Sequence, residues 1–302
     1  MEKFYFEEPS LKRKKDAIDY INAHDSINFV NNKLTKDYSE ASDKKKLIDE
    51  KYKKVTTSNN TIELLNNQNL QYENEQFKIY APHSLKEISK DMAVTSTERV
   101  SDIFEFFDIK SFRKVQVNLF DNKEEFRKFI AKIRGIEENK IPEYCTGTYD
   151  KGMINCFIDL KLLKNDIYYK RRTYTLAHEF IHIIYLEFIL NNDFYKRVTW
   201  LDEGVAQYLS GEMKDLDFDK FYNDIIDNLK EVPSLNDLKH GKGFVNDKYN
   251  GYALAYITVK YLSETTDLLE VLKSYNKSLE VGESALKEAL EYYKNKRVIN
   301  TK

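Results

Sequence analysis

The stretch of residues 173–190, TYTLAHEFIHIIYLEFIL, constrains the fold of this chain more than any other segment. Its spacing predicts a helix, and apolar side chains surround that helix on nearly every side. A helix of this kind is buried, so the rest of the chain must supply layers that cover it. It nevertheless carries His178, Glu179 and His182. Buried imidazoles and carboxylates are costly without compensation, so these three groups need partners.

The motif HEFIH places two histidines four positions apart, at residues 178 and 182. A helix turns by about 100° per residue, so both imidazoles project from one face and can share a metal ion. Glu179 lies too close along the chain to join the ion comfortably, but it can reach a water molecule bound there and take its proton. Chance occurrence of a five-residue pattern is the competing interpretation.

A second cluster, WLDEGVAQY at residues 200–208, predicts a further helix with two acids in its first turn. Glu203 lies 21 residues beyond His182. This interval allows the first helix to end, a loop around NNDFYKR to reverse direction, and an antiparallel helix to return a carboxylate to the metal. Two imidazoles and one carboxylate leave the fourth position of zinc open for water. Gly204 would allow close approach of another helix. The alternative is an exposed acidic turn favoured by the helix dipole.

Together, HEFIH and WLDEGVAQY resemble the gluzincin metallopeptidases, the superfamily of thermolysin and the aminopeptidase N-like enzymes. The resemblance implies a zinc metallopeptidase that acts on a peptide or protein substrate. It implies His178, His182 and Glu203 as ligands of Zn²⁺ and Glu179 as the general base. It is specific over residues 171–210, extends over roughly 84–265, and does not cover the first 75 residues.

Two supporting roles follow from the chemistry. An oxyanion needs a hydrogen-bond donor, and NGYALAYITVKYL resembles the helix where related enzymes carry a tyrosine, which selects Tyr252, with Tyr249 and the weaker His240 as alternatives. The chain holds 22 tyrosines, so chance placement competes with this assignment. A metal-bound histidine needs a carboxylate or carbonyl partner, for which Asp202 or Gln207 is expected. A simple helix-start acid is an equal alternative for Asp202.

The resemblance also implies that substrate pairs with the strand before the active helix. Met153, Ile154 and Asn155 lie in the last strand-like run before His178, so we expect them to form an edge strand that binds substrate. The aminopeptidase branch carries Gly-Ala-Met-Glu-Asn on that strand, and its Glu holds the free amino terminus of the substrate. This chain reads Gly-Met-Ile-Asn at 152–155, without a Glu, which favours an endopeptidase or an unusual substrate.

The order of elements predicts an α+β fold. Residues 1–75 are lysine-rich and are expected to form a helical appendage that ends in a linker around NNQNLQYENEQ. Residues 76–302 are expected to form the peptidase unit, with a small mixed sheet at 76–165, a mainly helical part at 166–302, and the active-site helix between them. The resemblance implies the arrangement of a thermolysin-like catalytic unit.

The segment YCTGTYDKGMINCFIDL predicts two strands joined by a tight turn. A two-residue loop at Asp150–Lys151 would place Cys145 opposite Cys156, whereas a three-residue loop would separate the two thiols. Two cysteines are too few for a disulfide scaffold, so we expect both to be reduced.

Composition excludes several classes of partner. The 48 Lys and Arg nearly cancel the 50 Asp and Glu, so no global charge points to nucleic acid or an acidic membrane surface. No apolar run reaches the roughly 20 residues that span a bilayer, and the charged N-terminus lacks a secretion signal, so we expect a cytoplasmic protein. The sequence does not indicate an oligomeric state. A non-catalytic protein-binding module on a peptidase scaffold is the competing function, although every residue that hydrolysis requires is present.

Overall fold

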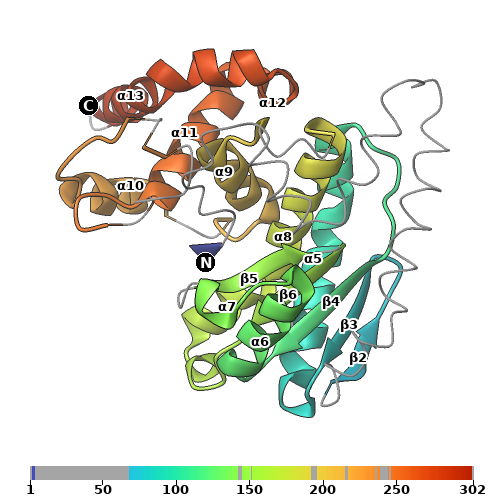
Figure 1. Cartoon of the computed structure of the whole chain (residues 1–302). Coiled ribbons are helices and arrows are strands. Elements are labelled where there is room, and N and C mark those ends of the chain that lie inside the picture. Colours follow the sequence, from blue (N-terminus) through green and yellow to red (C-terminus); the bar gives the residue numbers. More distant parts are fainter. Residues whose placement is uncertain are drawn as a thin grey trace. The chain divides into compact units, whose positions relative to one another are not determined.

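The computed structural model describes residues 2–3, 68–141, 145–150, 152–191, 196–214, 217–234, 237–238, 244 and 246–300 (Figure 1). Side chains are described in these ranges except at 2–3, 275–283 and 297–300. The appendage expected at 1–75 therefore lies largely outside the described residues. Contacts divide the chain into two units, Met1–Glu98 with Lys110–Glu179 and Arg99–Ile109 with Phe180–Lys302. Two of the three boundaries fall inside continuous helices, at 98/99 in α5 (Lys86–Phe107) and at 179/180 in α8 (Thr175–Ile184).

The first unit contains a mixed sheet with the strand order β1-β5-β6-β4-β3-β2. Its strands are β1 (Glu2–Lys3), β2 (Asn69–Glu73), β3 (Phe77–Ala81), β4 (Val115–Phe120), β5 (Cys145–Asp150) and β6 (Met153–Phe157). The strands β3, β4 and β6 run parallel, whereas β2 is antiparallel to β3 and β5 is antiparallel to β6. The two-residue β1 pairs in parallel with β5. The predicted α+β class with a small mixed sheet is confirmed.

Strand β2 lies in the segment that was expected to be a linker. That expectation is wrong, because Asn69–Glu73 form an antiparallel ladder with β3. The side chains of β2 are exposed or half-buried, whereas those of β3 alternate between buried and half-buried. A strand at the edge of a sheet needs little apolar surface, which explains why its polar sequence resembled a linker.

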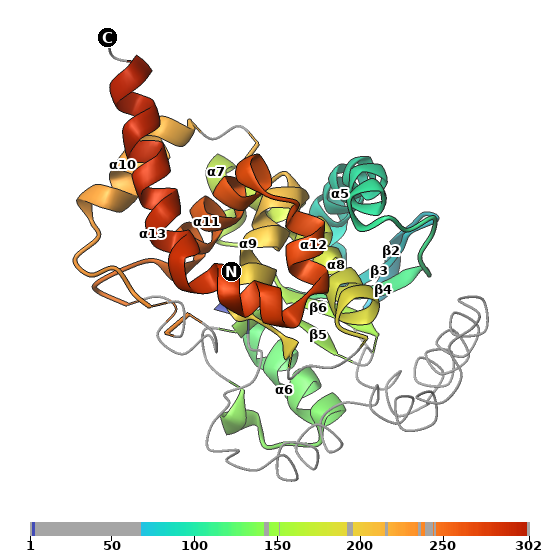
Figure 2. The same ribbon diagram turned by 90° about the horizontal axis from the view of Figure 1, so that it is seen from above.

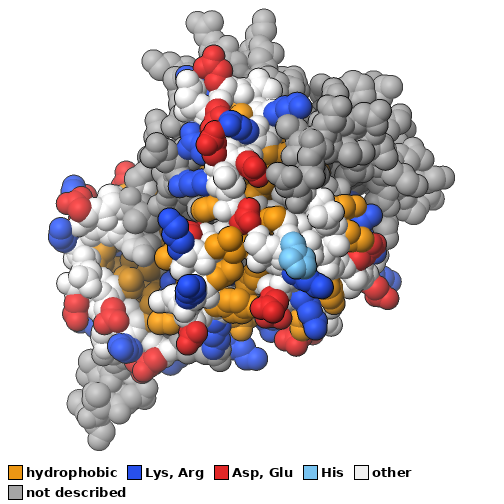
Figure 3. All heavy atoms as spheres, turned by 90° about the horizontal axis from the view of Figure 1, so that it is seen from below, with side chains coloured by type: hydrophobic (Ala, Val, Ile, Leu, Met, Phe, Trp, Pro, Cys, Tyr) orange, Lys and Arg blue, Asp and Glu red, His pale blue; other side chains and the backbone are white. Residues whose placement is uncertain are grey.

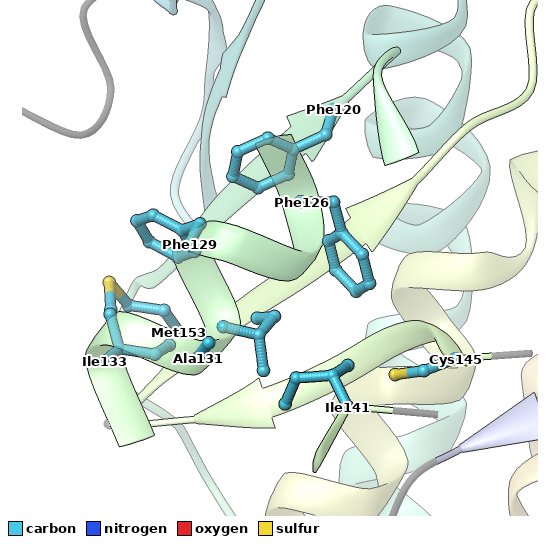
Figure 4. Packing of buried hydrophobic residues seen from close by; sticks show 9 residues of the cluster. Phe120, Phe126, Phe129, Ala131, Ile133, Ile141, Cys145 and Met153 are labelled. Carbon is cyan, nitrogen blue, oxygen red and sulfur yellow. The ribbon is translucent and has the colours of Figure 1, made fainter. Parts of the chain in front are cut away.

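Helix α6 (Lys123–Arg134) covers one face of this sheet. Its first turn is capped by Asn122, whose side chain accepts hydrogen bonds from two backbone N–H groups, and it ends at Gly135 with a φ of 69°. The apolar side of α6 packs on β4 and β6 through the buried residues Phe120, Phe126, Phe129, Ile130, Ile133 and Met153 (Figure 4). The periodic spacing of these side chains is the reason this segment forms an amphipathic helix.

The hairpin of β5 and β6 turns one residue later than a two-residue loop at Asp150–Lys151 would. Asp150 lies opposite Met153, and Gly152 adopts a φ of 81° in the turn. Gly147 therefore lies opposite Cys156, and the two cysteines are not cross-strand neighbours. Both cysteines are buried, and neither forms a disulfide.

Strand β6 is an interior strand, since it pairs in parallel with β4 and antiparallel with β5. The expectation that Met153, Ile154 and Asn155 form an edge strand is therefore wrong. The hairpin places β5 on the side of β6 away from β4. The backbone N–H and C=O groups on that side of β6 therefore bond to β5 and cannot pair with a substrate. The side chain of Asn155 is fully buried and accepts a hydrogen bond of 2.8 Å from Asn118 Nδ2.

The second unit is helical in its described residues. Besides the ends of α5 and α8, it contains α9 (Thr199–Ser210), α10 (Phe218–Asp227), α11 (Gly251–Thr265), α12 (Leu268–Lys273) and α13 (Tyr275–Asn300). Helix α11 packs against both α9 and α13 (Figure 2). A Cβ atom on Gly204 would lie 2.6 Å from the carbonyl oxygen of Ala255, so the predicted close approach of another helix at Gly204 is confirmed.

Charges are distributed without a single dominant sign on the face shown in Figure 3, where the described Lys and Arg side chains are interspersed with Asp and Glu. Within the described residues, no helix combines the length and the apolar character that crossing a bilayer requires.

A buried ion pair links the end of α6 to the end of β5, and its contribution to the stability of the first unit can be tested. Arg134 donates to both carboxylate oxygens of Asp150 at 2.6 and 2.8 Å. We expect Arg134→Met to lower the free energy of unfolding by about 3–5 kcal/mol in urea titrations, because it leaves a buried carboxylate without its cation. The matched variant Lys128→Met removes an exposed pair with Glu124 and should cost less than about 1 kcal/mol. Equal losses in the two variants would contradict this role.

Candidate metal centre

Helix α8 carries the HEFIH motif and is buried as its apolar sequence predicts. The exposed fractions of His178, Glu179 and His182 are 2%, 0% and 4%. The apolar residues around them are fully buried and comprise Leu176, Ala177, Phe180, Ile181, Ile183 and Ile184. Polar groups in such surroundings must be compensated within the protein or by an ion.

A π-helical turn, Tyr185–Ile189, follows α8 directly. Burial raises the pKa of the Tyr185 phenol, and the nearby Asp202 carboxylate raises it further. This tyrosine therefore stays a neutral phenol at physiological pH.

Helix α9 supplies the two acids of the WLDEG segment. Asp202 and Glu203 lie in its first turns, with exposed fractions of only 2% and 1%. The alternative of an exposed acidic turn is therefore contradicted. Trp200, Leu201 and Val205 anchor the helix from their buried positions.

The three predicted ligands come together. His178, His182 and Glu203 each offer one ligand atom, and these atoms all lie within 4.8 Å of one another. All three side chains are buried. Among the described residues, this is the one group of His, Cys, Asp and Glu that meets this criterion.

The donor set fits a zinc ion. Two imidazole nitrogens and one carboxylate oxygen form a ligand set that catalytic zinc sites use, and they leave a coordination position for water. The burial of all three donors favours a site built for an ion over a chance surface cluster. His178, His182 and Glu203 are the residues that would hold it.

Asp202 contacts one of these predicted ligands, His182. Its Oδ1 lies 2.5 Å from Nδ1 of His182. This contact favours the tautomer with the proton on Nδ1, which leaves Nε2 without a proton and able to bind a metal ion. Nε2 in turn lies 3.7 Å from Oε2 of Glu203. The predicted supporting position of Asp202 thus has a specific partner, His182.

Arg197 belongs to the same group, although the sequence analysis did not identify it. Its Nε donates to Asp202 Oδ2 at 2.6 Å, and a terminal nitrogen donates to Glu203 Oε1 at 3.4 Å. The Arg197 side chain is 8% exposed. An arginine placed five residues before one acid and six before another was the available signal, but it is a weak one outside a helix.

Gly147 on β5 is a second residue that the sequence analysis missed. A Cβ atom at this position would lie 2.9 Å from Oε1 of Glu179. The glycine therefore makes room for the carboxylate between α8 and the sheet. Its neighbour Thr148 faces the opposite side of β5, as alternation along a strand requires.

The expected oxyanion donors remain predictions. Tyr252 lies at the start of α11, and its ring packs edge-on against Phe244 with 4.7 Å between centroids. Tyr249 precedes α11, and its backbone N–H donates to Asn246 Oδ1. His240 lies outside the described residues. Gln207 is buried on α9, and its supporting role also remains a prediction.

The proposed contribution of Glu203 to zinc binding can be tested by substitution. We expect Glu203→Ala to weaken zinc binding at least about 100-fold, since it removes one of three donors. Chelator competition measures this dissociation constant. Ser210→Ala, a buried substitution on the same helix, should leave it unchanged. Retention of wild-type affinity in Glu203→Ala would refute the ligand assignment.

A search among curated proteins finds no match for the chain. The sequence model described as collagenase, Peptidase_M9, matches residues 10–293, which is nearly the whole chain. The chain therefore belongs to the collagenase family Peptidase_M9, a family of zinc metallopeptidases.

Proposed function

We propose that this protein hydrolyses internal peptide bonds with a zinc ion held by His178, His182 and Glu203. The observation that carries the proposal is the convergence of these three donors within 4.8 Å. Glu179, adjacent to the first ligand on α8, is fully buried. Family membership supports the metallopeptidase reaction itself. The HExxH helix with a downstream Glu supports a gluzincin-type, thermolysin-like arrangement.

Zinc bound to these residues would supply Lewis-acid chemistry, polarising the scissile carbonyl and making water more acidic. Glu179 acts as general base: its carboxylate takes a proton from the attacking water and returns it to the leaving amine. The apolar residues of α8 keep bulk water away from this carboxylate, which strengthens its electrostatic interactions. Asp202 holds the ring of His182 in one orientation. Tyr252, or Tyr249 in its place, donates a hydrogen bond to the developing oxyanion.

The proposed substrate is an extended peptide that binds close to Glu179, beside the β5 end of the sheet. Strand β5 lies beside β6 on the side away from β4, the two-residue β1 pairs with it at Cys145 and Gly147, and its Gly147 lies against Glu179. Its sequence, CTGTYD, contains no glutamate that could hold a free amino terminus. That composition supports cleavage within chains rather than removal of terminal residues. The name of the family makes gelatin a suitable test substrate beside casein.

The role of Glu179 is tested by Glu179→Gln, which retains the shape of the side chain and removes its basicity. We expect one zinc per chain, as in the wild type, with turnover of casein reduced by a factor of about 10²–10⁴. Elemental analysis and a casein assay with a chelator control measure the two quantities. Loss of zinc in this variant would contradict the general-base assignment. A wild type that binds zinc and lacks activity would favour the non-catalytic binding module.

The role of Gly147 is tested by Gly147→Ala. The added methyl group displaces the Glu179 carboxylate, so we expect kcat to fall by about 10-fold or more, since a small misplacement of a catalytic group is costly. Zinc affinity should not change. Thr148→Val is the matched control, because it alters the neighbouring side chain on the opposite face of β5. Equal losses of kcat in both variants would indicate a general effect on the strand and contradict this role.

A further inference from the structure

Arg197 connects the two buried acids of α9. It lies two residues before that helix, and its guanidinium donates to Oδ2 of Asp202 and to Oε1 of Glu203. A terminal nitrogen of the guanidinium also contacts Asp202 Oδ2. Because its side chain is only 8% exposed, these contacts are largely shielded from solvent.

In each acid, the carboxylate oxygen that does not contact Arg197 lies near the ring of His182. Asp202 Oδ1 lies 2.5 Å from Nδ1, and Glu203 Oε2 lies 3.7 Å from Nε2. The four side chains thus form a closed ring in which each carboxylate directs one oxygen to the guanidinium and the other to the imidazole. The two oxygens of Glu203 therefore have different neighbours, Arg197 at Oε1 and His182 at Oε2.

We propose that Arg197 is a positioning residue that holds Glu203 Oε1, so that the carboxylate offers a divalent ion Oε2 alone. This inference rests on the proposed zinc site. Zinc accepts five ligands as well as four. A carboxylate that is free to turn can donate both oxygens to one ion, and the second oxygen then occupies the position that water requires.

The charge of Arg197 supports a geometric role. A guanidinium beside a metal ligand repels a divalent cation, so it does not strengthen metal binding through its charge. Its planar fork suits it to fix the directions of carboxylate oxygens. The proposal therefore predicts different effects on metal binding and on catalysis: without Arg197, the metal stays bound and kcat falls.

The test compares Arg197→Met and Arg197→Lys with the wild type, and uses Arg134→Lys as the matched control. Arg134 is also a buried arginine paired with an aspartate, Asp150, but it lies in the sheet unit. Three quantities are measured: the zinc dissociation constant by chelator competition, the visible absorption of the cobalt(II)-substituted protein, and kcat of the zinc-loaded protein on casein.

We expect Arg197→Met to bind one zinc ion at least as tightly as the wild type. Its cobalt absorption should weaken, because cobalt(II) with five ligands absorbs less strongly than with four. Its kcat should fall by about 10–100-fold. Arg197→Lys should lie between the two, since lysine offers charge and donors but no planar fork. Arg134→Lys should leave all three quantities unchanged.

Three results would overturn the proposal: a zinc affinity of Arg197→Met reduced by more than about tenfold, a cobalt spectrum equal to that of the wild type, or the same changes in Arg134→Lys. If Arg197→Met does not fold, Arg197→Lys decides by the same readouts. A wild type that binds metal without hydrolysing casein would refute the proposed function, while the cobalt spectra would still decide the role of Arg197. A wild type that binds no metal would overturn both.

Discussion

The burial of imidazoles and carboxylates beside an apolar helix is the constraint on which the rest of this structure depends. His178, Glu179 and His182 lie on α8, which the surrounding chain covers completely. Such groups are tolerated only where other charges, hydrogen bonds or an ion compensate them. Helix α9 meets part of that need, since Asp202 and Glu203 lie beside the ring of His182. The same arrangement brings His178, His182 and Glu203 together as a possible ligand set for a divalent cation.

Two glycines make this arrangement sterically possible. At Gly204, the backbone of α11 approaches α9 so closely that a side chain would collide with Ala255. At Gly147, the carboxylate of Glu179 occupies the space where a side chain would begin. Gly204 follows the proposed metal ligand Glu203, and Gly147 lies against the proposed base Glu179. Close packing of the backbone therefore occurs next to the residues that would carry out the reaction.

Local patterns were sufficient for part of the site. The spacing of HEFIH predicts two imidazoles on one face of a helix, and the interval to WLDEG predicts a returning carboxylate. Both follow from helix geometry and loop length, which are short-range properties. The edge role of Met153–Asn155 was predicted wrongly, because strand order depends on pairing between distant segments. The sequence left the register of the two cysteines open for a related reason, since a shift of one residue in a turn changes every cross-strand neighbour.

The sequence by itself determined the α+β class, the burial of the helix that carries HEFIH, and the choice of His178, His182 and Glu203, which the structure brings together. These features follow from periodicity and from residue chemistry within a few turns of a helix. Only the tertiary structure decided which strand lies outside β6, that Gly147 faces Glu179, and that Arg197 bridges Asp202 and Glu203. Each of these contacts depends on how the chain packs or on the direction of individual side-chain atoms. These contacts depend on how distant segments of the chain pack together, so they leave no periodic pattern in the sequence.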